Sequence, residues 1–180
     1  AGTGVGAGSF KNVVGICKAY TTRVGNGPFP TEELGEIGVR LRETGDEFGA
    51  TTGRPRRCGW FDAVLVRQAG RLNGLTGIAL TKLDVLTGLD PLRICTAYRA
   101  DGERYERVPA SVRLLGAAVP EYEELPGWTE PLSQARRLED LPANARFMVV
   151  TRGHIVTGTD GFRNALYPDS PFVDQSQTYT

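Results

Sequence analysis

Histidine is almost absent from this sequence, because His154 is the only one among 180 residues. A lone histidine excludes metal sites with two histidine ligands and most catalytic triads. Cysteine is nearly as scarce: Cys17, Cys58 and Cys95 are far apart, and none belongs to a Cys-x-x-Cys pair. This spacing indicates neither a zinc site nor a disulfide scaffold, so we expect reduced thiols and no metal-ligating residues.

Long apolar runs and a net charge are lacking as well. No stretch has the length of a membrane span and no signal peptide is recognisable, which predicts a soluble cytoplasmic protein without a membrane partner. The 21 basic residues balance the 21 acidic ones, so the total charge gives no reason to expect a nucleic-acid partner.

The sequence does contain apolar segments of strand length that alternate with helical patterns. The segments typical of strands are residues 12–20, 75–80, 92–98 and 105–112, the last two joined by a turn at 100–103. One helix is predicted to begin after a cap at Thr31 and to end near Gly45 or Phe48, a second to span 62–72, and a third to begin within 138–146. The alternation predicts an α/β fold with a largely parallel sheet and flanking helices.

Both ends of the chain differ from this pattern. Residues 1–11 are rich in glycine but match no phosphate-loop pattern, because no strand precedes them and no Gly-Lys-Ser/Thr follows. Residues 147–180 scatter their apolar positions among Gly, Thr, Asp, Ser and Pro, which predicts a disordered tail. We therefore expect a glycine-rich end, a folded segment at 12–146 and a tail.

Residues 49–60 place three arginines, Arg54, Arg56 and Arg57, among glycines and threonines. Glycine lets a backbone approach a ligand closely, and an arginine fork binds a carboxylate or phosphate through two hydrogen bonds. The pattern predicts an anion-binding loop that is able to close over its ligand. The alternative is a solvated basic loop, the commoner origin of an arginine-rich stretch.

Lys82, Leu83 and Asp84 follow a predicted strand, at the position where open α/β sheets bind ligands. A carboxylate at Asp84 accepts two hydrogen bonds at once, which matches the adjacent N1–H and 2-amino donors of guanine but not adenine. The stem of Lys82 can lie along a flat base. The alternative is a plain strand-end turn. Residues 18–32 similarly suit either close approach to a ligand or a turn into the next helix.

In their amino-acid sequences and in their order along the chain, these segments closely resemble those of the adenylosuccinate synthetase family. The motifs are Lys-Ala-Tyr-Thr-Thr-Arg-Val-Gly-x-Gly-Pro-Phe-Pro-Thr-Glu at 18–32, Glu-Phe-Gly-Ala-Thr-Thr-Gly-Arg at 47–54, Cys-Gly-Trp-Phe-Asp at 58–62, Leu-Thr-Lys-Leu-Asp-Val-Leu at 80–86, Tyr-Glu-Glu-Leu-Pro-Gly-Trp at 122–128 and Leu-Pro-Ala-Asn-Ala at 141–145. The resemblance covers residues 12–146 and leaves 147–180 unmatched. It concerns only the carboxy-terminal half of the family members' sequences.

The resemblance implies a truncated fold of the P-loop NTPase-like kind and a GTP-dependent ligase of purine biosynthesis. Members of the family join IMP to L-aspartate, release GDP and phosphate, use Mg²⁺ and form homodimers. In this chain Val24 would contact IMP through its backbone. The residues that would form the mobile aspartate loop are Ala50, Thr51, Thr52, Gly53, Arg54, Pro55 and Arg56.

The resemblance also implies more specific roles within these segments. Thr52, Arg54 and Arg56 would hold the aspartate carboxylates, Arg54 would also reach the ribose of IMP, and Arg56 would also lie near GTP. Residues Lys82, Leu83 and Asp84 would form the guanine site, with Asp84 selecting the base.

Several parts that the family uses for phosphoryl transfer or to close its guanine pocket have no counterpart in this sequence. They are a Gly-Asp-Glu-Gly-Lys-Gly-Lys loop with the catalytic aspartate, a catalytic histidine, and a Gly-Pro-Asp-Arg loop near the carboxyl terminus; His154 is placed outside the matched region. Since phosphoryl transfer depends mainly on the phosphate cradle and the metal, we expect an inactive chain without catalytic residues or Mg²⁺ ligands. Two alternatives stay open: a non-catalytic guanine-nucleotide-binding module, and a truncated chain whose incomplete parallel sheet does not fold stably.

Overall fold

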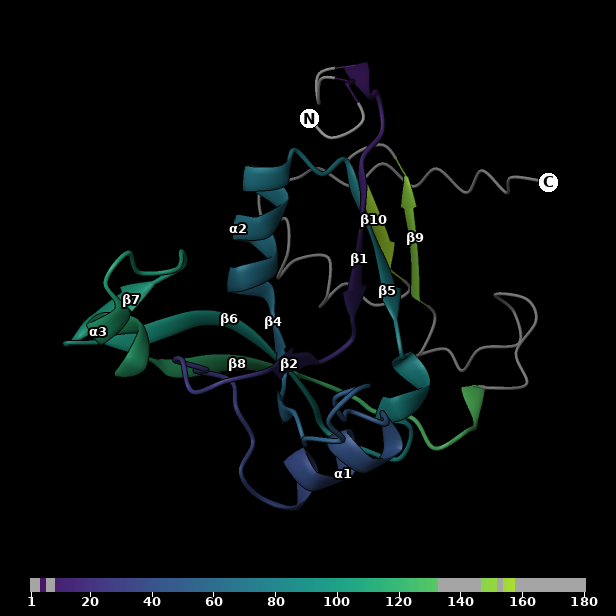
Figure 1. The fold of residues 1–180 in the computed structure, drawn as a ribbon, viewed down its shortest axis with the longest axis vertical. Helices are drawn as coiled ribbons and strands as arrows, with labels where there is room; N and C mark the ends of the chain where they lie inside the picture. The colour runs from purple at the N-terminus through teal and green to yellow at the C-terminus, as the bar shows by residue number, and fades with distance from the viewer. Residues whose placement is uncertain (1–3, 6–8, 133–146, 152–153, 158–180) are drawn as a thin grey trace.

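The computed structural model describes residues 4–5, 9–132, 147–151 and 154–157. Its helices and strands alternate along the chain, as Figure 1 shows. The strands are β1 (Val14–Lys18), β2 (Thr21–Arg23), β3 (Arg57–Gly59), β4 (Phe61–Asp62), β5 (Gly77–Thr81), β6 (Leu92–Ala100), β7 (Glu103–Tyr105), β8 (Val119–Leu125), β9 (Phe147–Thr151) and β10 (His154–Thr157). The helices are α1 (Glu36–Thr44), α2 (Ala63–Asn73) and α3 (Val112–Gly116), and a 3₁₀ helix, η2, spans Leu83–Leu86.

The strands form parallel and antiparallel pairs, and the expected α/β class is confirmed. β1 pairs with β5 and β4 pairs with β6 in parallel. The other pairs in the described part of the chain, β2–β3, β6–β7, β6–β8 and β9–β10, are antiparallel. Helix α1 packs against β3, helix α2 packs against β6, and the β9–β10 hairpin lies beside β5 (Figure 1). In the parallel β1–β5 pair, the two carboxyl ends lie side by side, with Lys18 opposite Thr81.

One apolar core joins the ends of these elements. It gathers the buried side chains of Tyr20, Leu41, Trp60, Ile78 and Leu86, which come from the β1–β2 turn, α1, the β3–β4 junction, β5 and η2. Full burial of an apolar side chain of this size contributes about 1.5–3 kcal/mol. The core therefore holds the carboxyl ends of β1 and β5 against α1 and the segment that follows it.

The helix predicted at 62–72 is confirmed as α2. Asp62 caps it, since its Oδ1 accepts a hydrogen bond from the Leu65 amide at 3.0 Å, and Gly74 ends it in a left-handed conformation with φ of 59°. Cap and stop are local signals, which is why the sequence predicts this helix well.

The predicted cap of α1 at Thr31 is wrong. The helix begins after Gly35, which has an extended backbone and, as a glycine, no side chain with which to cap. Thr31 is fully buried, its carbonyl accepts a hydrogen bond from the Trp60 amide at 3.1 Å, and Glu32 forms a β-bridge with Gly59. Pairing with a segment that lies far along the chain thus outweighs the local cap signal.

The strand predicted at 105–112 is wrong as well, although the turn at 100–103 is confirmed. Asp101 and Gly102 both have positive φ, at 50° and 81°, as a tight hairpin turn requires. β7 already ends at Tyr105, and Ser111 caps the short helix α3. Strand β8 was not predicted, because it is rich in acidic residues; it is stabilised by cross-strand ion pairs to β6, such as Arg93–Glu124 at 3.0 Å.

β1 keeps an exposed apolar face. Within the described ranges it pairs only with β5, and the side chains of Val14 and Ile16 are 53% and 80% exposed. Parallel strands are normally covered on both faces, so this pair is unusually open.

Two of the predicted features, the helix within 138–146 and the tail at 147–180, lie wholly or partly outside the described residues. The helix predicted within 138–146 lies outside the described residues. Strands β9 and β10 lie inside the segment that the sequence assigns to a tail, and residues 158–180 are outside the described ranges. The boundary of the tail therefore stays a prediction.

Candidate functional site

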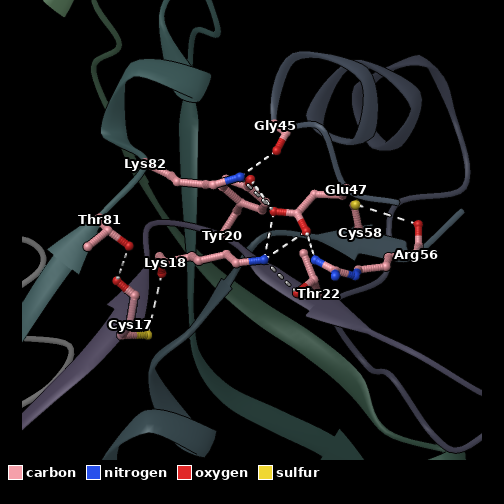
Figure 2. Close-up of polar contacts among 10 residues, drawn as sticks. All are labelled: Cys17, Lys18, Tyr20, Thr22, Gly45, Glu47, Arg56, Cys58, Thr81 and Lys82. Carbon is pink, nitrogen blue, oxygen red and sulfur yellow. Dashed lines mark hydrogen bonds and ion pairs between the residues drawn. The ribbon is translucent and has the colours of Figure 1, made fainter. Parts of the chain in front are cut away.

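A buried carboxylate, Glu47, gathers the segments that the sequence singles out. Its side chain is fully buried and accepts hydrogen bonds from four residues, whose side chains converge on it in Figure 2. These are Lys18 Nζ at 2.7 and 2.8 Å, Tyr20 Oη at 2.6 Å, Arg56 Nη1 at 2.7 Å and Lys82 Nζ at 3.4 Å. A single acid thus connects the β1–β2 turn, the arginine-rich loop and the end of β5.

The parallel register of β1 and β5 brings the two lysines to Glu47. Lys18 lies opposite Thr81, so Lys82 leaves the sheet at the same edge, one residue later. Lys82 has φ of 58°, a left-handed conformation that is uncommon for residues other than glycine. From there its ammonium group donates to the Gly45 carbonyl as well as to Glu47. This backbone turn also starts η2 and thereby positions Asp84.

Residues 47–56 form a small hairpin, which we call the arginine hairpin. The Arg56 amide donates to the Glu47 carbonyl at 2.9 Å, Phe48 bridges Pro55, and the Gly49 amide donates to the Arg54 carbonyl at 2.8 Å. The tip, residues 50–54, is exposed. Because Glu47 and Arg56 face each other at the base of the hairpin, their ion pair closes it.

The three arginines of this stretch lie in different surroundings. Arg54 is exposed, and its side chain has no ion pair within the ranges described. Arg56 pairs with Glu47. Arg57 forms two hydrogen bonds to Glu32, at 2.7 and 2.5 Å, and donates to the carbonyls of Gly25 and Gly27. Arg57 thus ties down the loop that contains Val24, whereas the Arg54 side chain has no such structural partner among the described residues.

The hydrogen bonds around Glu47 stabilise its charged form. Burial alone would raise the pKa of this carboxyl, but the bonds from Lys18, Tyr20 and Arg56 lower it to about 2. Burial and the bond to Glu47 raise the pKa of Tyr20 well above its ordinary range, so this phenol stays a donor. Glu47 is therefore ionised at any pH at which proteins normally work.

Positive charge is in excess around this acid. Three cations meet one carboxylate, and the side chains of Lys18, Arg56 and Lys82 remain 29%, 32% and 39% exposed. An excess of exposed cations around a buried acid attracts anions from solvent. Chemically, the arrangement suits a carboxylate or a phosphate group.

Asp84 lies in η2 with an exposed side chain that has no hydrogen bond or ion pair to any described residue. It lies two residues after Lys82, whose ammonium group donates to Glu47. Leu83 packs against the main core, and Val24 is 72% exposed in the loop that Arg57 ties down. The structure thus brings residues 82–84 and Arg56 to one region, as a shared ligand site requires.

Sequence reasoning missed Glu47 as a site residue. An acid inside a basic, glycine-rich stretch carries no pattern of its own, and its partners lie up to 35 residues away. The one available signal was the motif at 47–54, which begins with this glutamate.

The described residues contain no group of three or more histidine, cysteine or acidic side chains that could hold a metal ion. None of the helices described is long and apolar enough to cross a membrane.

Comparisons with known proteins agree in their result. The family model described as adenylosuccinate synthetase matches residues 1–155, a range that includes His154 and is wider than the 12–146 of the motif-based resemblance. A protein of Moorella thermoacetica named adenylosuccinate synthetase is 63% identical over 145 residues, which are 81% of this chain and 34% of the relative. One of Bacillus cytotoxicus with the same name is 51% identical over 177 residues, covering 98% and 40%.

Among solved structures, the fully ligated adenylosuccinate synthetase of Plasmodium falciparum aligns with a TM-score of 0.74 and 40% identity, over 79% of this chain and 35% of that one. The chain therefore spans 34–40% of the length of the relatives and structures it matches.

Proposed function

This chain belongs to the adenylosuccinate synthetase family, and on that premise we propose that it carries the guanine-binding and aspartate-binding segments of a GTP-dependent ligase. The proposed reaction joins IMP to L-aspartate and gives adenylosuccinate, GDP and phosphate. By itself the chain is expected to be inactive, because it covers only 34–40% of the relatives' length.

The observation that carries this proposal is the pair of contacts on Glu47. One oxygen accepts from Lys82 of the guanine segment at 3.4 Å, and the other accepts from Arg56 of the arginine hairpin at 2.7 Å. Two segments separated in sequence therefore meet at one carboxylate, as expected if they serve neighbouring ligands. Had they lain on opposite faces of the molecule, a common site would have been excluded.

The guanine assignment depends on Asp84. Its carboxylate is exposed and without a partner among the described residues, so both oxygens are available to the N1–H and 2-amino donors of guanine. Adenine offers no such pair of donors and would leave the acid unpaired. Lys82 and Leu83 precede Asp84 in the sequence, and the stem of Lys82 provides an apolar surface for the base.

The aspartate assignment depends on the tip of the arginine hairpin. Arg54 is exposed and unpaired in the described part, and Arg56 uses only Nη1 for Glu47. Their remaining N–H donors suit the two carboxylates of L-aspartate, and Arg56 is also proposed to lie near GTP, whose phosphates a guanidinium fork can bind. The Thr52 hydroxyl and the backbone of Ala50, Thr51, Gly53 and Pro55 complete the proposed loop. Val24 is proposed to contact IMP through its backbone.

Mg²⁺, a homodimer and a cytoplasmic location belong to the proposal through the family alone. The described residues offer no set of metal ligands, so none of the roles assigned above passes through the ion.

Calorimetry with GDP tests the guanine site. Asp84→Asn is expected to weaken GDP binding by about 10- to 100-fold, since a hydrogen bond to a charged group is worth about 1.5–3 kcal/mol. The same variant is expected to gain affinity for xanthosine diphosphate, because the carboxamide donates to the 2-oxo group that replaces the 2-amino group. Asp101→Asn is the matched control, an exposed carboxylate at the β6–β7 turn. Equal GDP binding by both variants would rule the guanine site out.

An assay for phosphate release tests the expected inactivity. The 180-residue chain with GTP, IMP and L-aspartate should release no phosphate above the background of a chain-free control. Turnover by the pure chain would contradict this expectation. Binding of GDP without binding of L-aspartate would favour a guanine-nucleotide-binding module instead.

A further inference from the structure

Glu47 has no acceptor capacity to spare. A carboxylate accepts about four hydrogen bonds, and this one receives bonds from Lys18 to both oxygens, from Tyr20 and Lys82 to Oε1, and from Arg56 to Oε2. A fully buried acid that is saturated by protein donors does not bind a ligand itself. Its possible roles are therefore to stabilise the fold in general or to position the groups that bond to it.

The two oxygens serve different segments. Oε1 faces Tyr20 and Lys82, on the side of the guanine segment, residues 82–84. Oε2 faces Arg56, at the base of the arginine hairpin. Figure 2 shows Lys82 and Arg56 approaching the carboxylate from different directions.

No other polar contact in the described ranges joins these two segments directly. Hydrogen bonds between residues 81–86 and residues 45–56 run from the Lys82 ammonium to the Gly45 carbonyl or to Glu47. Arg40 reaches the carbonyls of Thr87 and Gly88, but it comes from α1 and does not contact the hairpin. The Arg56 guanidinium, in turn, has its only ion pair in the described part with Glu47.

We propose that Glu47 is a positioning residue that holds the arginine hairpin and the guanine segment at a defined separation, so that its neutralisation disturbs both together. The positioning follows from the contacts just described, whereas its consequence for GTP and L-aspartate rests on the proposed function. Lys18 and Tyr20 complete the assembly, because they keep the carboxylate fixed when its other partners engage a ligand.

Hydrogen exchange without ligand tests the positioning itself. Glu47→Gln keeps the shape of the side chain and removes its charge. The amides of Gly49, Gly53 and Arg56 in the hairpin, and that of Thr87 after η2, should exchange at least about tenfold faster, since the lost bonds are to a charged group. Glu124→Gln, which breaks the exposed Arg93–Glu124 pair of β6 and β8, is the matched control and should leave these amides unchanged.

The pattern of exchange distinguishes positioning from general stability. Faster exchange in both segments, with the amides of α2 unchanged, supports the proposal. Faster exchange throughout the chain, in only one of the two segments, or in neither overturns it.

Calorimetry then connects the positioning to ligands. Glu47→Gln should weaken the binding of both GDP and L-aspartate by about tenfold, although the residue touches neither ligand. If the unaltered chain binds neither ligand, the proposed function fails while the exchange result still decides the positioning. If the unaltered chain binds both and Glu47→Gln weakens only one, the positioning role is overturned and the proposed function stands.

A second variant covers the case in which Glu47→Gln does not fold. Glu47→Asp keeps the charge and shortens the side chain by one methylene, so it should fold and give a smaller increase of exchange in the same two segments. Exchange like that of the unaltered chain overturns the proposal. Loss of folding in both variants overturns it too, because Glu47 would then act on global stability.

Discussion

Arg56 and Arg57 are neighbours in the sequence, yet they belong to two different kinds of ion pair. Arg56 bonds to Glu47, a fully buried acid that also receives Lys18 and Lys82. Arg57 has Glu32 as its acidic partner and donates two hydrogen bonds to it. The first cluster has more positive than negative charge, whereas the second is balanced.

This difference in charge explains the difference in role. In the balanced pair, Arg57 uses its remaining donors on the carbonyls of Gly25 and Gly27, and its guanidinium lies 5.4 Å from the centre of the Phe29 ring. Its donors are consumed within the protein, which is the mark of a structural tie. In the unbalanced cluster three cations share one carboxylate, so positive charge is left over to bind an anion. Exposure does not separate the two cases, because the side chain of Arg57 is 29% exposed as well. Counting partners thus identifies Arg57 as a structural arginine and leaves Arg56 with N–H donors that no described residue accepts.

The largest expected effect concerns acid. Glu47 has a pKa of about 2 in the folded chain, against an ordinary 4.5. Between pH 4.5 and pH 2 this carboxyl therefore binds a proton more readily in the unfolded chain than in the folded one. The stability that Glu47 contributes is complete above about pH 4.5 and is lost as the pH falls toward 2. This amounts to roughly 3 kcal/mol.

Urea unfolding at pH 6 and pH 3 measures the part of this loss that falls above pH 3, about 2 kcal/mol. Glu47→Gln should flatten the dependence on pH, and Glu32→Gln, in the less buried pair, should flatten it less. Equal slopes in both variants would remove the contrast between the two clusters.

The next effect is on the structural pair. Arg57→Ala is expected to lower the free energy of unfolding by about 2 kcal/mol, because Glu32 and two backbone carbonyls lose a charged donor. Urea unfolding gives the value, and Arg57→Lys should recover only part of it, since lysine has no fork. A change below half a kcal/mol would show that this pair does not stabilise the fold.

Arg56→Ala should affect binding more than stability. Because Arg56 is partly exposed and Glu47 keeps Lys18 and Tyr20, we expect the free energy of unfolding to fall by only about 1 kcal/mol. Binding of L-aspartate, measured by calorimetry, should weaken by about tenfold. The reverse pattern, with a large loss of stability and normal binding, would assign Arg56 to the same class as Arg57.

The smallest effect on stability is expected for Arg54. This side chain is exposed and pairs with no described residue, so Arg54→Ala should change the free energy of unfolding by less than about 0.5 kcal/mol. Its effect on L-aspartate binding should still equal or exceed that of Arg56→Ala. Unchanged binding would show that the tip of the hairpin is only a solvated basic loop.

Local signals predicted those parts of the fold that depend on neighbours in sequence. Asp62 caps α2 by accepting a hydrogen bond from the amide of Leu65, three residues further along the chain. The turn at Asp101 and Gly102 needs only a pair of residues that tolerate positive φ. The cap at Thr31 failed because a competing partner, Trp60, lies far along the chain. The acidic strand β8 escaped prediction for the same reason, since its partners are arginines of β6.

The sequence by itself determined the family and named the residues that we propose to bind ligands, because the motifs at 18–32, 47–54 and 80–86 can be read without coordinates. The tertiary structure alone decided which charges meet. Glu47 is 29 residues from Lys18 and 35 from Lys82, and Glu32 is 25 from Arg57. The lysines reach Glu47 because the parallel strands β1 and β5 end side by side, and Glu32 reaches Arg57 beside its bridge to Gly59. No local preference specifies either pairing.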